Sequence, residues 1–214
     1  MALFGSTGKQ MPPHHERSVR AMERLASWGF SLDVLQRLGG FSVAWGLFET
    51  QLESALWVLT NEKVKGVRPS TDKIPISGQI QLLVKHSNLL SPLAQGVVTT
   101  AGGAATDLME YRHAIMHGAL IPAAVGGPSF MRNPRWHGEQ RARPTHDAHV
   151  DENLLDLAID TTWVLCQVVF SVKSAVVESG AMKSLESLAQ AVQRAKSQAN
   201  ELRHLSDLMN CEKY

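Results

Sequence analysis

One short segment near the middle of the chain carries the side chains best suited to chemistry. It reads Tyr-Arg-His-Ala-Ile-Met-His-Gly over residues 111–118, which places one arginine and two histidines within six residues. His113 and His117 are four residues apart, so a helix would present both imidazoles on one face. Arg112 would lie about 100° around that helix from His113 and can reach toward the same patch. A guanidinium beside two titratable rings can bind a phosphodiester and move protons around it.

The spacing predicts that this segment ends a helix. Gly118 is of the residue type that commonly follows a helix, so His117 is expected in the last turn. The partial negative charge of a helix C-terminus favours a protonated imidazole there. Upstream, Ser91 and Pro92 are a typical helix start, although Gly102-Gly103 weakens the first half of the helix unless it packs tightly.

Apolar residues recur at helical spacing along most of the remaining chain, which predicts an all-α fold. We expect a flexible N-terminus over residues 1–15, a helical domain over 16–180 and a C-terminal helix over 181–214. The apolar seam of that last helix can serve a second copy or a protein partner, or it can fold back on the domain. The expected helices cover about 16–28, 32–59, a short segment capped by Ser77, 92–117, a segment from Asp151 to Gly180, and 182–209.

About thirty residues between Gly118 and Asp151 lack helical periodicity and contain several prolines. Phe130-Met131 is expected to form a short hairpin with Trp136-His137. Basic side chains surround a tryptophan here, a pattern typical of single-stranded RNA binding by stacking and phosphate contacts. The alternative is a surface loop whose tryptophan packs on the bundle. The predicted RNA-binding residues are Arg132, Arg135, Trp136, Arg141 and Arg143.

The bulk properties exclude several classes of protein. A formal net charge of +1 gives no global basic field, so nucleic acid would have to bind a local patch. Two cysteines cannot frame a disulfide-rich fold, and Cys166 is expected to be buried. We find no signal-peptide pattern, and the most apolar run, residues 161–172, is too short to span a membrane. A soluble, cytoplasmic protein is the expectation.

Arg112, the polar His113 directly after it, and His117 together resemble the motif of HEPN domains, in which four to six residues separate an arginine from a histidine. The layout from about residue 32 to residue 179 is also similar: a long helix with Trp45 and Glu49, a shorter helix, the motif helix, an irregular insertion and another long helix. The resemblance implies a HEPN-like helical bundle with a long irregular insertion before the last core helix and a C-terminal helical tail.

Many HEPN proteins are metal-independent ribonucleases of RNA processing, toxin–antitoxin pairs and phage defence. The resemblance therefore implies cleavage of RNA by its own 2′-hydroxyl, giving 2′,3′-cyclic phosphate ends, without metal or cofactor. His117 would transfer protons, Arg112 would stabilise the phosphate, and His113 would orient His117 or share its work. Two motifs facing each other in a homodimer would form one composite active site. Glu49 is expected to support the site by pairing with Arg112, whereas Glu53 is expected on a solvated face.

Three alternatives compete with catalysis. The chain can be a non-catalytic HEPN-like module that binds RNA, a nucleotide or a protein. In one family variant a tyrosine lies two residues after the histidine, but Ala119 occupies that position here, which argues against an antitoxin that modifies such a tyrosine. His113 and His117 have a spacing suited to zinc, but the glutamate of the metalloprotease motif is missing because Ala114 follows His113. Finally, these residues can merely end a helix.

Overall fold

Helices dominate the structure, as predicted for an all-α fold. The computed structural model describes residues 12–66, 70–122, 127–132, 137–138, 147–178 and 180–211, without the side chains of Ser70 and of residues 206–211. The α-helices are α1 (Pro13–Ser27), α2 (Leu32–Leu59), α3 (Ile76–His86), α4 (Pro92–His117), α5 (Glu152–Val177), α6 (Met182–Ser187) and α7 (Ala189–Cys211). The remaining elements are the 3-10 turns Ser70–Lys73 and Ser87–Leu89 and the strands β1 (Ala119–Ile121), β2 (Ser129–Met131) and β3 (Ala148–His149).

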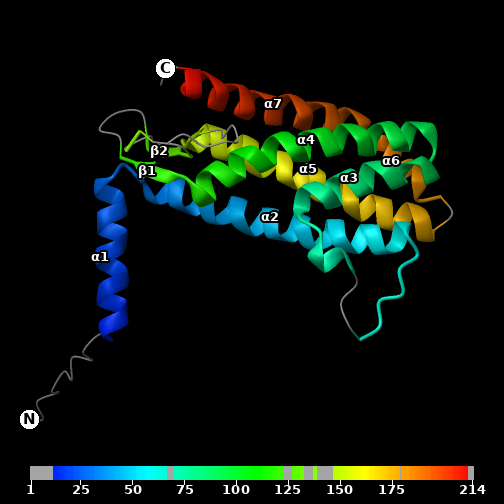
Figure 1. Cartoon of the computed structure of the whole chain (residues 1–214), viewed down its shortest axis with the longest axis horizontal. Helices are drawn as coiled ribbons and strands as arrows, with labels where there is room; N and C mark the ends of the chain where they lie inside the picture. Colours follow the sequence, from blue (N-terminus) through cyan, green and yellow to red (C-terminus); the bar gives the residue numbers. More distant parts are fainter. Residues whose placement is uncertain are drawn as a thin grey trace, which may run out of the picture.

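Four long helices form the bundle, in two parallel pairs of opposite direction (Figure 1). Within the first pair, Arg37 near the start of α2 donates to Asp156 near the start of α5 (2.8 Å), and Lys173 farther along α5 donates to Gln51 farther along α2 (3.2 Å). The second pair is α4 and α7, and the short α3 packs against α4. The bundle thus places the C-terminal end of α4 beside the small sheet.

The core forms from the apolar stripes that the periodicity predicts. The stripe of α2 continues without a break through Gly39-Gly40, and Phe41, Trp45, Phe48 and Leu52 are all at most 2% exposed. Burial of such side chains contributes roughly 1.5–3 kcal/mol each. Cys166 is buried among them as predicted, and burial raises the pKa of its thiol to about 11.

The predicted caps of α4 and α5 are confirmed. Ser91 accepts from the backbone N–H of Ala94 (3.3 Å), and Asp151 accepts from that of Leu154 (2.8 Å). Ser77 as the cap of α3 is wrong: the helix begins one residue earlier, at Ile76, after a proline in extended conformation and without a side-chain cap. At the N-terminus, α1 begins at Pro13, so residues 13–15 are helical and not part of a flexible lead.

The insertion contributes a small antiparallel sheet in the order β1-β2-β3. Phe130 of β2 pairs with Leu120 of β1 and with Ala148 of β3. The expected hairpin of Phe130-Met131 with Trp136-His137 is wrong, because β1 and β3 occupy the two edges of β2. Trp136 itself lies outside the described residues. Phe130 packs edge-on against Phe30, in the connection between α1 and α2 (ring centroids 6.1 Å), which fixes the sheet to the bundle.

The C-terminal seam folds back on the domain. Val192, Ala195, Ala199 and Leu202 of α7 are at most 1% exposed and pack toward α4 and α5. Small side chains in this seam allow the helices to approach closely. The apolar positions of the tail are thus used within the chain. By length and composition α5 could cross a membrane, contrary to the expectation that its apolar run is too short; 56% of its most apolar window is buried inside the bundle.

Candidate anion-binding site at the end of α4

The last two turns of α4 bring the predicted catalytic residues together. The rings of His113 and His117 lie 5.9 Å apart between centroids, at an interplanar angle of 52°. His117 is exposed at the helix end, whereas His113 and Arg112 are half-buried. The helical spacing thus produces the shared imidazole face that the sequence predicts.

No hydrogen bond or ion pair joins the side chains of Arg112, His113 and His117 to other residues in the described part of the chain. A half-buried guanidinium usually pairs with a carboxylate or with carbonyl groups, because desolvation without a partner costs free energy. Here its donors remain available beside two imidazoles. An anion with several oxygen acceptors, such as a phosphate, is the ligand chemistry that matches these donors.

The environment of His113 favours the neutral ring. Burial lowers the pKa of His113, and the nearby charges of Arg112 and Arg132 lower it further, although Glu110 partly opposes them. A neutral imidazole can accept a proton, so His113 is suited to act as a base or to accept a hydrogen bond.

Arg132, one of the predicted RNA-binding residues, holds the end of α4. Its Nη1 donates to the backbone carbonyl of His113 (2.9 Å), and its backbone N–H donates to Asp147 (2.9 Å). A cation at a helix C-terminus is favourable because the last carbonyls carry partial negative charge. Arg132 therefore links β2 to the site. The other predicted RNA-binding residues, Arg135, Trp136, Arg141 and Arg143, lie outside the described residues.

Gly118 turns the chain from α4 into β1. Its φ of −78° is open to any residue, so conformational freedom does not explain the glycine. Space does: a Cβ at this position would overlap the carbonyl of Ala114 and lie 3.0 Å from the Cβ of Phe130. The close approach of β2 to the helix end thus requires a residue without a side chain.

Glu49 does not pair with Arg112, contrary to expectation. Its carboxylate accepts from the indole Nε1 of Trp45 (2.6 Å). Arg112 lies level with Phe41, because the adjacent Tyr111 contacts that ring (centroids 6.2 Å). Eight residues of α2 separate Phe41 from Glu49, a distance of about 12 Å along the helix axis. The two charges are therefore at different levels of the bundle.

Glu53 is 5% exposed, so the expectation of a solvated face is wrong. It accepts from Thr71 (2.9 Å), whose hydroxyl in turn accepts from the indole of Trp57 (2.7 Å). A hollow of about 330 Å³ lies beside this network, lined also by Asp72 and Gln79. Its carboxylates repel phosphate, so this hollow is not a second site for the anion chemistry of α4.

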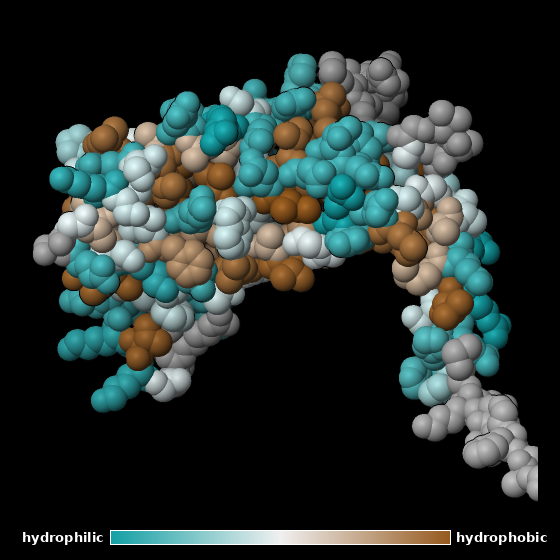
Figure 2. All heavy atoms as spheres, turned by 180° about the vertical axis from the view of Figure 1, so that it is seen from behind, coloured by the Kyte–Doolittle hydropathy of each residue, from teal (hydrophilic) through white to brown (hydrophobic). Residues whose placement is uncertain are grey.

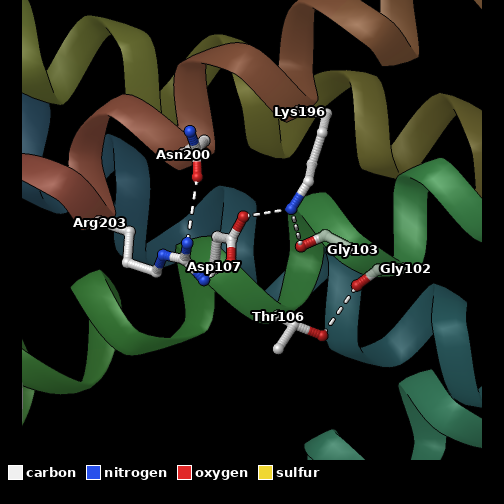
Figure 3. A network of polar contacts seen from close by, with 7 residues as sticks. All are labelled: Gly102, Gly103, Thr106, Asp107, Lys196, Asn200 and Arg203. Carbon is white, nitrogen blue, oxygen red and sulfur yellow. Dashed lines mark hydrogen bonds and ion pairs between the residues drawn. The ribbon is translucent and has the colours of Figure 1, made fainter.

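A second charged group on α4 was not foreseen. Asp107 is 3% exposed and binds Lys196 and Arg203, both on α7 (Figure 3). Lys196 also donates to the carbonyl of Gly103 (3.3 Å). Lys196 and Arg203 are seven residues apart and therefore lie on one face of a helix. That spacing, together with the single aspartate Asp107 in a mostly apolar helix, was the sequence signal for this contact.

A zinc site has too few ligands in the described part of the chain. There, no group of three or more histidine, cysteine, aspartate or glutamate residues is arranged to hold a metal ion, so His113 and His117 have no third ligand. No protein-family model matches the chain, and neither a curated protein nor a solved structure gives a match.

Proposed function

We propose that this chain is a metal-independent endoribonuclease of the HEPN type, acting at the end of α4. The observation that carries the proposal is a half-buried Arg112 that has no charged partner among the described residues, next to two imidazoles whose centroids are 5.9 Å apart. Arginine for the phosphate and histidines for the protons are the groups that cleavage of RNA by its 2′-hydroxyl requires.

In the proposed reaction the 2′-oxygen attacks the adjacent phosphorus, and the bond from phosphorus to the 5′-oxygen breaks. One imidazole takes the proton of the 2′-hydroxyl, and a protonated group gives a proton to the leaving 5′-oxygen. Arg112 stabilises the additional negative charge on the phosphorane. The products are a 2′,3′-cyclic phosphate and a 5′-hydroxyl. His117 is assigned proton transfer because it is exposed, and His113 is assigned the neutral, proton-accepting state that its lowered pKa favours.

Base and acid must act on opposite sides of the phosphorus, which two rings on adjacent turns of one helix reach with difficulty. A homodimer with two facing motifs would supply the second histidine from the other copy. The proposal therefore includes a composite site, with RNA as the substrate.

The test is cleavage of a mixed RNA pool in EDTA. The wild type is compared with Arg112→Ala and His117→Ala, and with the matched controls Arg194→Ala and His204→Ala, which remove an exposed arginine and an exposed histidine of α7. We expect a loss of at least about 100-fold in the first two variants and none in the controls. The cyclic phosphate is identified by its resistance to a phosphomonoesterase, which removes the phosphate only after acid has opened the ring. Cleavage that persists in both site variants would contradict the proposal.

A second candidate is binding of RNA without cleavage. It is favoured by the absence of any hydrogen bond from the described residues to either imidazole, because a catalytic base is usually oriented by a partner group. In that case the wild type leaves the pool intact, yet it binds RNA with an affinity that falls steeply with salt and depends on Arg112.

A further inference from the structure

No other described residue covers the apolar side of the first helix along most of its length. α1 stands away from the bundle, across the direction of α2 (Figure 1), and none of its residues is buried. Val19 and Met22 are each 41% exposed, and Ala26 lies on the same stripe. Only the base of the helix, through Leu25 and Trp28, touches the core. A helix of 15 residues is marginal by itself in water, so a surface that covers this stripe would stabilise it.

The same chain carries an apolar surface that no described residue covers. We name Val43, Leu47, Trp163 and Phe170 the α2–α5 ridge; they are 75%, 37%, 51% and 43% exposed. They lie at one level of the bundle, because Cys166 of α5 contacts the carbonyl of Ala44 in α2. Figure 2 shows hydrophobic side chains along the lower edge of the bundle, on the side toward which α1 projects. Contiguous apolar surface of this kind commonly marks an interaction site.

The two surfaces match in length and in charge. Val19 to Ala26 and Trp163 to Phe170 each span seven residues, or about 10 Å of helix. Glu16, which also pairs with Arg20 (3.4 Å), flanks the apolar stripe of α1 one turn before Val19. Lys173, which also donates to Gln51, borders the ridge with its ammonium 5.8 Å from the ring centroid of Phe170. An antiparallel arrangement with Val19 over Phe170 therefore places Glu16 opposite Lys173.

We propose that α1 of one copy covers the α2–α5 ridge of a second copy, and that the second copy does the same in return. A stable interface buries about 800 Å² on each partner, so α1 and the α2–α5 ridge of each copy would each have to supply on the order of 400 Å². The two half-exposed aromatic rings of the ridge alone offer roughly 200 Å². Because each chain carries both α1 and the α2–α5 ridge, a two-fold dimer makes the contact between them twice. This inference does not depend on cleavage of RNA.

The first test is the oligomeric state by light scattering and sedimentation. We expect the wild type to be a dimer at micromolar concentration, and Met22→Glu and Trp163→Glu to raise the dissociation constant at least 100-fold. Leu89→Glu is the matched control, because Leu89 is 66% exposed but belongs to neither surface. Circular dichroism checks that each variant keeps its helices. A monomeric wild type, or a dimer that both site variants leave intact, would overturn the proposal.

The second test distinguishes a second copy from the chain's own bundle. Two single variants, Met22→Cys and Trp163→Cys, are mixed under mild oxidation in a background with Cys211→Ser. We expect a disulfide that joins the two different chains, and we expect none when Leu89→Cys replaces Trp163→Cys. Suppose instead that the doubly substituted chain closes a disulfide within itself and the mixture of single variants forms none. Then α1 covers its own ridge, and the dimer proposal is wrong.

Discussion

The charged side chains in the middle of α4 and at its end differ in whether they have charged partners. Asp107 is nearly inaccessible to water and is bound by two cations of α7. Only five residues later, Arg112 is half-buried with no charged partner in the described part of the chain, and His117 is exposed beside it. The same helix thus carries a fully paired charge and an available one.

The contrast separates a structural charge from a candidate functional one. A buried carboxylate is tolerated only when bonds to its partners offset the free-energy cost of its desolvation. The docking of α7, which supplies two cations, therefore explains Asp107. Arg112 has no such explanation within the fold. We therefore expect substitutions in the middle of α4 to reduce stability, and substitutions at its end to reduce function alone.

The largest effect is expected from Asp107→Ala. It leaves Lys196 and Arg203 without their acceptor, but both cations are partly in water, so we expect a loss of about 2–3 kcal/mol in the free energy of unfolding. Urea titration measures the loss, and limited proteolysis shows whether α7 is released. Asp160→Ala is the control, because this exposed acid also contacts α7, through Gln198, and should cost less than about 1 kcal/mol. Equal losses in the two variants would contradict the special structural role of Asp107.

A smaller loss is expected from Gly102→Ala. A Cβ there would overlap the side chain of Val84 in α3, so overpacking should cost about 1–3 kcal/mol and outweigh the gain of about 1 kcal/mol in helix propensity. Gly96→Ala is the control on the same helix, because a Cβ at Gly96 meets nothing within 4 Å and alanine is the better helix former by about 1 kcal/mol. Thermal unfolding should therefore shift in opposite directions, and a shift in the same direction would contradict the packing argument.

A modest dependence on pH is expected from His113. Its pKa is lowered in the folded chain, so the unfolded chain binds a proton at a pH at which the folded chain does not. Stability should be full above about pH 6.5, the ordinary imidazole value, and should fall as the pH drops through the lowered pKa. His113→Gln should remove this part of the pH dependence between pH 8 and pH 5, whereas the exposed His204→Gln should not. Unfolding titrations at both pH values measure it.

The smallest change in stability is expected from Arg112→Ala and His117→Ala. At pH 8 each should alter the free energy of unfolding by no more than about 0.5 kcal/mol, because neither side chain loses a hydrogen bond or ion pair to another described residue. The same samples used for the RNA assay provide the measurement. A loss of 2 kcal/mol or more, estimated as the range for a structural charge, would make these residues resemble Asp107 and would favour a purely structural role.

The sequence predicted the helices because their apolar spacing is a local property. Ser91 and Asp151 were identifiable as caps for the same reason, and the arrangement of His113 beside His117 follows from helix geometry alone. Glu49 was assigned the wrong partner, because the level at which two helices meet depends on packing that no local pattern contains.

Burial of polar groups was also beyond local prediction. Glu53 has the spacing of a surface residue, but the connector after α2 returns to cover it with Thr71. The seam of α7 was ambiguous in the same sense, since a heptad pattern shows which side chains need a cover and not which surface supplies it. Only the docked structure shows that α4 and α5 cover it.

The bond between Asp107 and Lys196 spans 89 residues of chain, and this has a consequence for synthesis. At roughly 5–20 residues per second, the ribosome makes Lys196 about 4 to 18 seconds after Asp107. Throughout that interval the acid and the apolar side of α4 lack their cover, so the nascent domain cannot complete its core. We expect the growing chain to remain accessible to chaperones until α7 emerges, and to fold as a unit only then.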